Sequence, residues 1–379
     1  MILGIDASRA YAPQKTGVEW YAYFVIEAFK KMWQTNPELH KKIQVILYIN
    51  TPATSECNDL PVGWRVKHLH WPPKKYWTQA RLSLEMLFHA PDILWIPAHV
   101  MPLIHPKNTV MTVHDISAIE FPQSYSWFEQ WYSLWSVRFA LKYARHIITP
   151  SAYTKQQITE FFGGVYEKKI TPIAHGYSPE YATKKDAAET NRVLKKYGIQ
   201  QPYILTIGRQ EYKKSTARLI QAFTEVRNTY PQTVRQLVCI GKPGYGYEAV
   251  QQAIDTSPYK QDILLPGWVE QNDVPYILSA AEVFVFPSLS EGFGIPVLEA
   301  IASGVPVVTS EQSSMAEIAE DNTLCFVDPL SVASIATGMF TMIDDAPYRT
   351  TCIHNGQERA KQFSWDATAK RTLSALIGE

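Results

Sequence analysis

The chain has 379 residues, too many for one ordinary core and enough for two α/β domains. Hydrophobic residues make up 46% and charged residues 19%, which is typical of a globular protein and excludes a disordered chain or a collagen-like repeat. The formal net charge is zero, but residues 1–200 carry 23 Lys+Arg against 16 Asp+Glu, whereas residues 201–379 carry 13 against 20. A basic first half would favour binding to an anionic ligand or to an anionic membrane surface. Two oppositely charged domains that face each other would explain the same charge counts equally well.

The cysteines are widely spaced and form no CxxC pair, so we expect reduced core residues in a cytoplasmic protein: Cys57, Cys239, Cys325 and Cys352. No stretch approaches the roughly 20 apolar residues that a membrane-spanning helix requires. Any membrane contact is therefore expected to be peripheral.

In the first half, short apolar runs alternate with helical or turn-rich stretches. Residues 2–6 predict a strand that leads through a polar loop into a helix over 18–32. Further buried strands are predicted at residues 43–48, 93–95, 109–113 and 146–149. Such alternation indicates a mostly parallel sheet, whose ligands bind where strand ends meet helix starts.

A polar stretch over residues 177–201 separates this series from a second one. Strands are predicted at 203–208, 236–240, 263–265, 283–286 and 305–308, and helices near 215–230 and 247–255. We therefore predict two Rossmann-like α/β domains facing across a cleft, an N-terminal one over 1–190 and a C-terminal one over 191–360. Residues 361–379 form a terminal segment that begins with a Ser- or Asp-capped helix.

The most informative stretch runs from Phe286 to Ala300. A strand ends at Phe286, a Gly-rich loop carries Glu291, and Pro296 can open a helix with Glu299 in its first turn. The backbone NH groups of Gly292, Phe293 and Gly294, with the helix N-terminus behind them, would cradle phosphate or sugar oxygens. The two carboxylates could accept hydrogen bonds from sugar and ribose hydroxyls.

The Glu-x7-Glu spacing from Glu291 to Glu299 resembles the signature of the retaining glycosyltransferases of group 1, or family 4, which have the two-domain GT-B fold. Further matching stretches are Gly208-Arg209 through Lys214, Leu265 to Val269 and Phe326 to Pro329. The resemblance implies that Glu291 contacts the transferred sugar and Glu299 the ribose. It also implies that the terminal helix crosses back toward the N-terminal domain.

By this resemblance, Arg209 and Lys214 clamp the donor diphosphate next to Gly208. Fixed cations stabilise the charge that develops on a leaving nucleoside diphosphate. Lys213 is adjacent, and only the pattern favours Lys214. The resemblance also places backbone groups around Leu265 at the nucleotide base.

In the N-terminal half, the resemblance places His114, which follows an apolar run, against the transferred sugar. It places Gly17 in a loop near the donor phosphates or the acceptor. Many relatives have two adjacent glycines there, and this chain has Thr16 before Gly17.

We expect no metal and no cofactor, because no Asp-x-Asp occurs to bridge a divalent cation to a diphosphate. The donor itself would be a nucleotide-sugar of the GDP-mannose or UDP-glucose type. The resemblance suggests a glycan or lipid-linked acceptor of surface polysaccharide assembly, in the cytoplasm or at the inner face of the membrane, and no nucleic acid.

The segment 121–146 is rich in aromatic residues and basic near its end. A helix here could touch a membrane-borne acceptor, but we favour core packing, since such rings supply a large buried area. Two alternatives to a transferase stay open: a nucleotide-sugar epimerase of the same architecture, and a nucleotide-sugar binding protein without turnover.

Overall fold

The computed structural model describes residues 1–12, 14–50, 59–71, 76–98, 100–232, 234–320 and 322–378. Two compact units divide the chain. Unit 1 comprises residues 1–122, 126–176 and 364–379, and unit 2 comprises residues 123–125 and 177–363. Among the described residues, no helix combines the length and the apolar character needed to cross a bilayer. Cys57 lies outside the described residues, and Cys239, Cys325 and Cys352 are buried free thiols.

Unit 1 is built on a parallel sheet of seven strands in the order β3-β2-β1-β4-β5-β6-β7. The strands are β1 (Ile2–Asp6), β2 (Gln44–Ile49), β3 (Trp64–His68), β4 (Ile93–Ile96), β5 (Thr109–Thr112), β6 (His146–Thr149) and β7 (Ile170–Pro172). The central strands consist of β-branched and other apolar residues because both faces of the sheet are covered.

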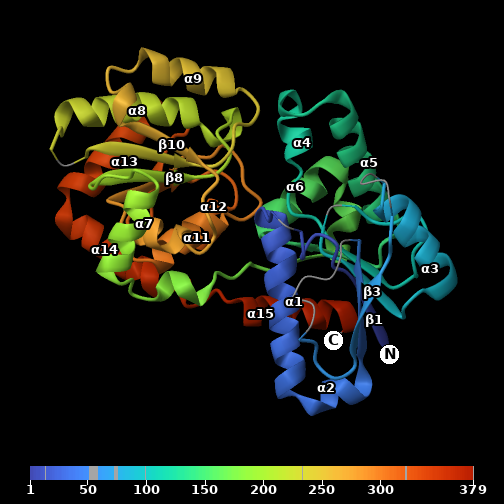
Figure 1. Cartoon of the computed structure of the whole chain (residues 1–379). Helices are drawn as coiled ribbons and strands as arrows, with labels where there is room; N and C mark the ends of the chain where they lie inside the picture. Colours follow the sequence, from blue (N-terminus) through green and yellow to red (C-terminus); the bar gives the residue numbers. More distant parts are fainter. Residues whose placement is uncertain are drawn as a thin grey trace. The chain divides into compact units, whose positions relative to one another are not determined.

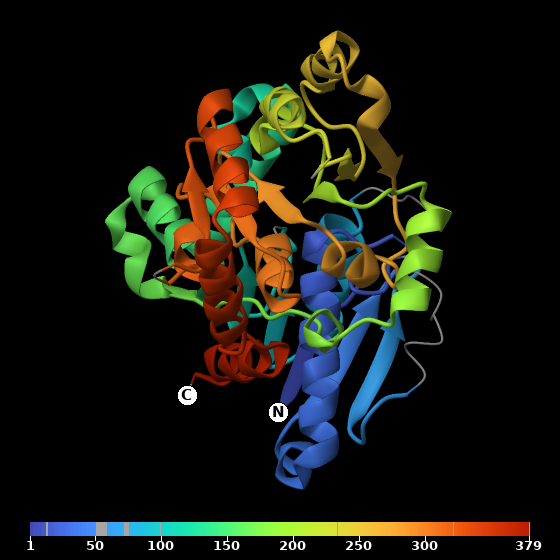
Figure 2. The same cartoon turned by 90° about the vertical axis from the view of Figure 1, so that its left-hand side faces the viewer.

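The helices of unit 1 are α1 (Gly17–Thr35), α2 (Pro37–Lys42), α3 (Ser83–His89), α4 (Ser117–Glu120), α5 (Trp127–Tyr143), α6 (Ala152–Phe162) and α15 (Trp365–Ile377). Shorter helical pieces of this unit are η2 (Thr78–Leu82) and η4 (Gly164–Lys169); η3 (Pro122–Ser124) has its first residue in unit 1 and the other two in unit 2. Figure 2 shows α2 continuing from the end of α1. As expected, Ser364 caps α15, its side chain accepting a hydrogen bond from the Ala367 amide. This helix packs on α1 (Figure 1).

Unit 2 has a parallel six-stranded sheet in the order β10-β9-β8-β11-β12-β13. Its strands are β8 (Tyr203–Ile207), β9 (Gln236–Ile240), β10 (Ile263–Gly267), β11 (Val283–Phe286), β12 (Val307–Ser310) and β13 (Cys325–Val327). The order reverses between β8 and β11, and ligands of such sheets bind at the carboxyl ends of the strands beside this reversal.

The helices of unit 2 are α7 (Ala187–Lys196), α8 (Thr216–Thr229), α9 (Tyr247–Thr256), α10 (Val274–Ser279), α11 (Ile295–Ala302), α12 (Met315–Ile318), α13 (Val332–Asp344) and α14 (Ala346–Ala360), with η5 (Pro179–Ala182), η6 (Tyr212–Lys214) and η7 (Lys260–Asp262). Figure 1 shows α8 and α9 on one face of the sheet and α11 and α14 on the other.

The limits of the two units differ from those of the predicted domains, whose boundaries were placed after residues 190 and 360. Unit 2 begins at Tyr177 because the polar linker folds onto it: Tyr181, Val193 and Leu194 are buried there. At the C-terminal end, the residues from Ser364 onward belong to unit 1 again.

Candidate active site

The loops at the carboxyl ends of the unit 2 strands are joined by backbone hydrogen bonds. The Gly208 amide donates to the Ile240 carbonyl (2.9 Å), and the Gly241 amide donates to the Gly267 carbonyl (3.0 Å). A Cβ on Gly241 would lie 2.0 Å from the Gly208 oxygen, so only glycine fits there. Gly208, at the end of β8, is thereby held at the point where the strand order reverses.

Lys214 and Glu291 form an ion pair at this edge. The Lys214 Nζ donates to the Glu291 carboxylate, and the two side chains are only 17% and 13% exposed. The ammonium also lies 5.0 Å from the centroid of the Phe286 ring. Burial lowers the pKa of Lys214, and the attraction of Glu291 opposes this only in part. The geometry thus distinguishes Lys214 from its neighbour Lys213, which the sequence could not do.

Arg209 follows Gly208 directly and is exposed. Within the described part of the chain, its side chain makes no hydrogen bond and no ion pair. A guanidinium at a strand end presents a planar set of donors suited to a phosphate. Arg209 is therefore available to a ligand, whereas Lys214 is already paired.

The loop between β11 and α11 is tied to its surroundings by serine hydroxyls. Ser314 Oγ donates to the Glu291 carbonyl (2.9 Å), and Ser288 Oγ donates to the Lys213 carbonyl (3.3 Å). These bonds fix the backbone on either side of Glu291, so its carboxylate is held in place before a ligand arrives.

The end of this loop requires glycine at position 294. Gly294 caps α11 with φ +98°, and a Cβ there would lie 2.5 Å from Met315 Cε. Phe293 turns its ring into the unit, edge-on to Phe363 at 6.0 Å between centroids. Its side chain is therefore structural, and only its backbone, with those of Gly292 and Gly294, can serve a ligand at the start of α11.

Glu299 is the fifth residue of α11, so its predicted place in the first helical turn is wrong, because the helix begins at Ile295 and not at Pro296. Burial raises the pKa of Glu299 to about 8, although a hydrogen bond with Tyr181 lowers it. Tyr181 is almost fully buried in η5, and its hydroxyl also accepts from Gln271 Nε2 (3.4 Å). No sequence signal singled out Tyr181, because its partner lies far along the chain.

Leu265 lies in β10, an edge strand whose pairing with β9 shifts register between Leu264 and Gly267. Its side chain packs against the core of unit 2, which leaves its backbone for any recognition of a base. Beyond it, the Trp268 ring is 44% exposed, with Lys242 Nζ 5.3 Å from the ring centroid. The sequence did not mark this pair.

Gly17 and His114, the two remaining predicted residues, belong to unit 1. Gly17 is the first residue of α1, and a Cβ on it would meet no atom within 4 Å. Thr16 caps this helix and forms a capping box with Glu19, whose carboxylate also accepts from Arg9 Nη1 (2.9 Å). Thr16 thus has a local structural role that a second glycine could not fill. Burial would raise the pKa of Glu19, but the hydrogen bonds from Thr16 and Arg9 outweigh it and lower that pKa.

His114 follows β5 and is buried, with Nε2 2.9 Å from the Pro97 carbonyl. A carbonyl can only accept, so Nε2 carries the proton. The ring meets Tyr21 edge-on at 4.7 Å and His175 at 5.8 Å between centroids. Burial, and then the nearby His114, hold the pKa of His175 well below its usual range. Sequence reasoning missed His175.

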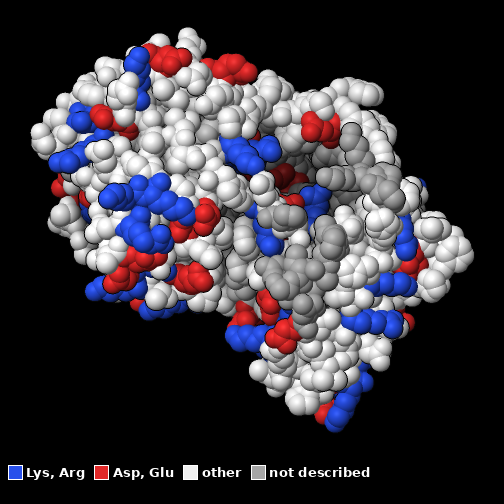
Figure 3. All heavy atoms as spheres, viewed as in Figure 1, with Lys and Arg blue, Asp and Glu red and all other residues white. Residues whose placement is uncertain are grey.

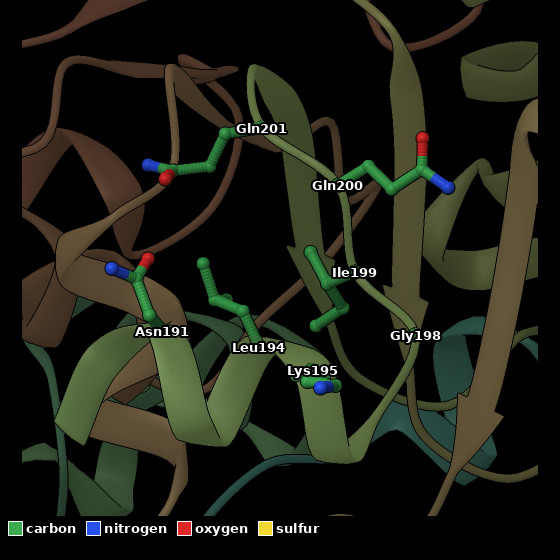
Figure 4. Close-up of a pocket in the computed structure, with 7 residues that line it drawn as sticks. All are labelled: Asn191, Leu194, Lys195, Gly198, Ile199, Gln200 and Gln201. Atoms are coloured by element: carbon green, nitrogen blue, oxygen red, sulfur yellow. The ribbon is translucent and has the colours of Figure 1, made fainter. Parts of the chain in front are cut away.

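The structure was also searched for metal-binding groups and for surface pockets. The described residues hold no group of three or more His, Cys, Asp or Glu side chains that could bind a metal ion. A surface pocket between the end of α7 and residues 198–201 (Figure 4) is lined by Leu194, Ile199 and polar amides, and it contains none of the predicted site residues.

Comparison with known proteins identifies the family of the chain. Residues 189–359 match the family described as glycosyl transferases group 1, and residues 33–181 match glycosyltransferase family 4. O-antigen chain mannosyltransferase B of Escherichia coli is 30% identical over 318 residues, which cover 83% of this chain and 78% of that protein. Glycogen synthase of Mycobacterium tuberculosis is 28% identical over 77% of this chain and 69% of its own length.

Solved structures share the fold. HepE of Anabaena, in complex with UDP-glucose, superposes with a TM-score of 0.75 at 17% identity, covering 100% of this chain and 99% of that one. WaaG, a glycosyltransferase involved in lipopolysaccharide biosynthesis, gives a TM-score of 0.74 at 15% identity, covering 100% of both chains. These neighbours have the GT-B fold, as do the two parallel-sheet units described here.

Proposed function

The chain belongs to the group 1 and family 4 glycosyltransferases, and from this premise we propose that it transfers a hexosyl group, with retention of configuration, from a nucleoside-diphosphate sugar to a glycan or lipid-linked acceptor. The observation that carries the proposal is the buried Lys214–Glu291 pair beside the unpaired Arg209, at the reversal of strand order in unit 2. The relatives reported above give the epimerase alternative no support.

In the proposed mechanism, a diphosphate binds Arg209 and Lys214 and the backbone at the start of α11. Lys214 then exchanges part of its contact with Glu291 for the phosphate, and Glu291 becomes free to accept hydroxyl groups of the sugar. The bond between the anomeric carbon and the phosphate oxygen breaks, and its electron pair leaves with the diphosphate. Positive charge held in place before the reaction stabilises this leaving group without reorganisation.

The acceptor hydroxyl attacks the anomeric carbon from the face that the diphosphate leaves, and a phosphate oxygen accepts its proton. His114, which follows β5, would contact the transferred sugar. No metal ion is needed in this scheme, since the two cations neutralise the diphosphate. The Glu299 carboxylate accepts hydrogen bonds from the ribose hydroxyl groups.

For the donor we propose GDP-mannose ahead of UDP-glucose. Mannosyltransferase is the printed name of the relative at 30% identity, whereas the structural neighbour with UDP-glucose shares only the fold. O-antigen assembly in that relative supports a role in surface polysaccharide synthesis, in the cytoplasm or peripherally at the inner face of the membrane.

The test measures thermal stabilisation and slow release of nucleoside diphosphate with a panel of nucleotide-sugars, in the presence of EDTA. Wild type is compared with Glu291→Gln, Lys214→Ala and the matched neighbour Lys213→Ala. We expect one donor to stabilise wild type and Lys213→Ala, and both other variants to lose turnover by roughly a hundredfold or more.

The outcomes separate the candidate functions. If no donor stabilises wild type, the proposal fails. Stabilisation without turnover, even with glycan acceptors present, identifies a binding protein without catalysis. Activity that disappears with EDTA and returns with a divalent cation contradicts the metal-free mechanism alone.

A further inference from the structure

A hollow lies in unit 1 where the last turns of α15 meet the first residues of β6 and β7. Its volume is about 320 Å³, and it is lined by Arg145, His146, Thr171, Ser374, Ala375 and Gly378. His146 is the first residue of β6, whereas the predicted sugar contact His114 follows the end of β5. Because these strands are parallel, the hollow lies at the opposite edge of the sheet from His114.

Arg145 is anchored beside the hollow by the end of α15. Its Nη2 donates to the carbonyls of Ala375 (2.9 Å) and Leu376. Carbonyls of a last helical turn have no partner within the helix, so the guanidinium offsets the negative end of α15. Within the described residues, Nη1 donates no hydrogen bond, and a Cβ on Gly378 would lie 3.3 Å from it. The side chain is thus fixed, while glycine leaves space for a ligand next to Nη1.

Lys169, the residue before β7, supplies a second cation. Its Nζ donates to the Leu141 carbonyl of α5 (2.6 Å). As with Arg145, the partner of the charge is a carbonyl, and no carboxylate of the described ranges forms an ion pair with either side chain.

The Leu141 carbonyl belongs to the part of α5 that packs into the core. The buried residues of this helix are Ser136, Val137, Ala140 and Leu141. The expected core packing of the aromatic segment is therefore wrong for the first half of α5, whereas the second half gives Lys169 a fixed partner.

His146, which lines the hollow, lies in the positive field of both cations. Burial lowers its pKa, and the charges of Arg145 and Lys169 lower it further. The ring is therefore neutral at pH 7, and its Nε2 lies 2.9 Å from Thr171 Oγ1. A hydroxyl can accept one hydrogen bond and donate another, so Thr171 and Ser374 can both donate to an anion. The hollow thus combines uncompensated positive charge with neutral donors.

We propose that this hollow binds a small phosphorylated molecule, with its phosphoryl group on Arg145 and its hydroxyl groups on Thr171 and Ser374. A guanidinium and an ammonium are the side chains that proteins use to bind phosphate. The volume is in the range of small-molecule pockets, so the hollow admits an organic part beside the phosphoryl group. A bound ligand would join α15 to β6 and β7 and stabilise the folded chain by mass action.

The inference is independent of the proposed transferase function, because none of the residues that line the hollow belongs to the candidate active site. Loss of glycosyl transfer and loss of this binding are therefore separate results.

The experiment measures binding to the full chain by titration calorimetry at constant ionic strength, with glycerol 3-phosphate, inorganic phosphate and glycerol as probes. The variants are Arg145→Gln and Ser374→Asp. Arg145→Gln also removes the partner of the last α15 carbonyls, so Ser374→Asp tests the hollow without that loss. The matched control is Lys42→Gln, which changes the net charge equally at an exposed position of α2, where basic and acidic side chains lie together (Figure 3).

We expect glycerol 3-phosphate to bind wild type and Lys42→Gln alike, inorganic phosphate to bind more weakly, and glycerol not to bind. Both variants of the hollow should weaken the binding of glycerol 3-phosphate about tenfold or more, because one loses charge-assisted hydrogen bonds and the other gains a repelling carboxylate.

The proposal is overturned if neither phosphate probe binds wild type, or if Lys42→Gln weakens binding as much as Ser374→Asp does. Binding that persists in Ser374→Asp and disappears in Lys214→Ala would place the probe at the candidate active site, which also overturns it.

Discussion

Glu299 gives the sharpest prediction, because its carboxyl group should make donor binding depend on pH above neutrality. Burial raises its pKa to about 8, so at pH 7 only about one molecule in ten carries the ionised form. The carboxylate accepts two ribose hydroxyl groups better than the neutral acid does. Deprotonating it at pH 7 costs about 1.4 kcal/mol, a factor of about ten in affinity.

Affinity for the nucleoside diphosphate should therefore rise about tenfold between pH 7 and pH 9, as measured by titration calorimetry. Glu299→Gln should flatten this rise. Tyr181→Phe should move it to higher pH, because the Tyr181 hydrogen bond lowers the pKa of Glu299. Tyr203→Phe is the matched control, since this tyrosine is also buried in unit 2 but donates its hydrogen bond to the Ile277 carbonyl and not to Glu299.

A flat wild-type profile, or a rise that persists in Glu299→Gln, would refute the assignment of Glu299 to the ribose. The same shifted pKa affects stability. The unfolded chain releases this proton near pH 4.5 and the folded chain near pH 8, so the free energy of unfolding without ligand should fall as pH rises through this window.

Two substitutions test whether a side chain fits at Gly241 and at Gly17. Gly241→Ala places a Cβ 2.0 Å from the Gly208 oxygen at φ +138°, so we expect a loss of about 3 kcal/mol and a lower melting temperature. Gly17→Ala meets open space and should melt like wild type; equal melting of the two would contradict the steric account. Ser364→Ala removes the hydroxyl that accepts from the Ala367 amide and should cost about 1 kcal/mol in chemical denaturation, whereas Ser364→Asp should retain the cap.

The strands that the sequence predicted are those with uniform composition. β11 is apolar throughout, and β1 and β9 are apolar except for one terminal residue each, because helices cover both faces of the sheets. The strands that it missed are β3, β7 and β13, all of which lie at sheet edges. β3 mixes Arg65 and Lys67 with Val66, and β7 and β13 have three residues each, too short to show a period.

The candidate site shows a similar division. Arg209, Lys214 and Glu291 lie on loops and turns after strand ends, and Glu299 lies in α11, so all four belong to short stretches whose sequence resembles the family pattern. Tyr181 could not be found in this way, because its hydrogen bond with Glu299 spans more than a hundred residues of sequence and depends on how the linker folds onto unit 2.

The location of α15 has a consequence for how the chain is made. Trp365 stacks on Phe24 of α1 at 5.2 Å, and Thr368 donates a hydrogen bond to the Ala174 carbonyl, so the last helix completes the interior of unit 1. A ribosome synthesises all of unit 2 before it reaches this helix. Until then the apolar surface of α1 that α15 later covers lacks its partner, so we expect unit 1 to complete its folding only after unit 2 has been synthesised.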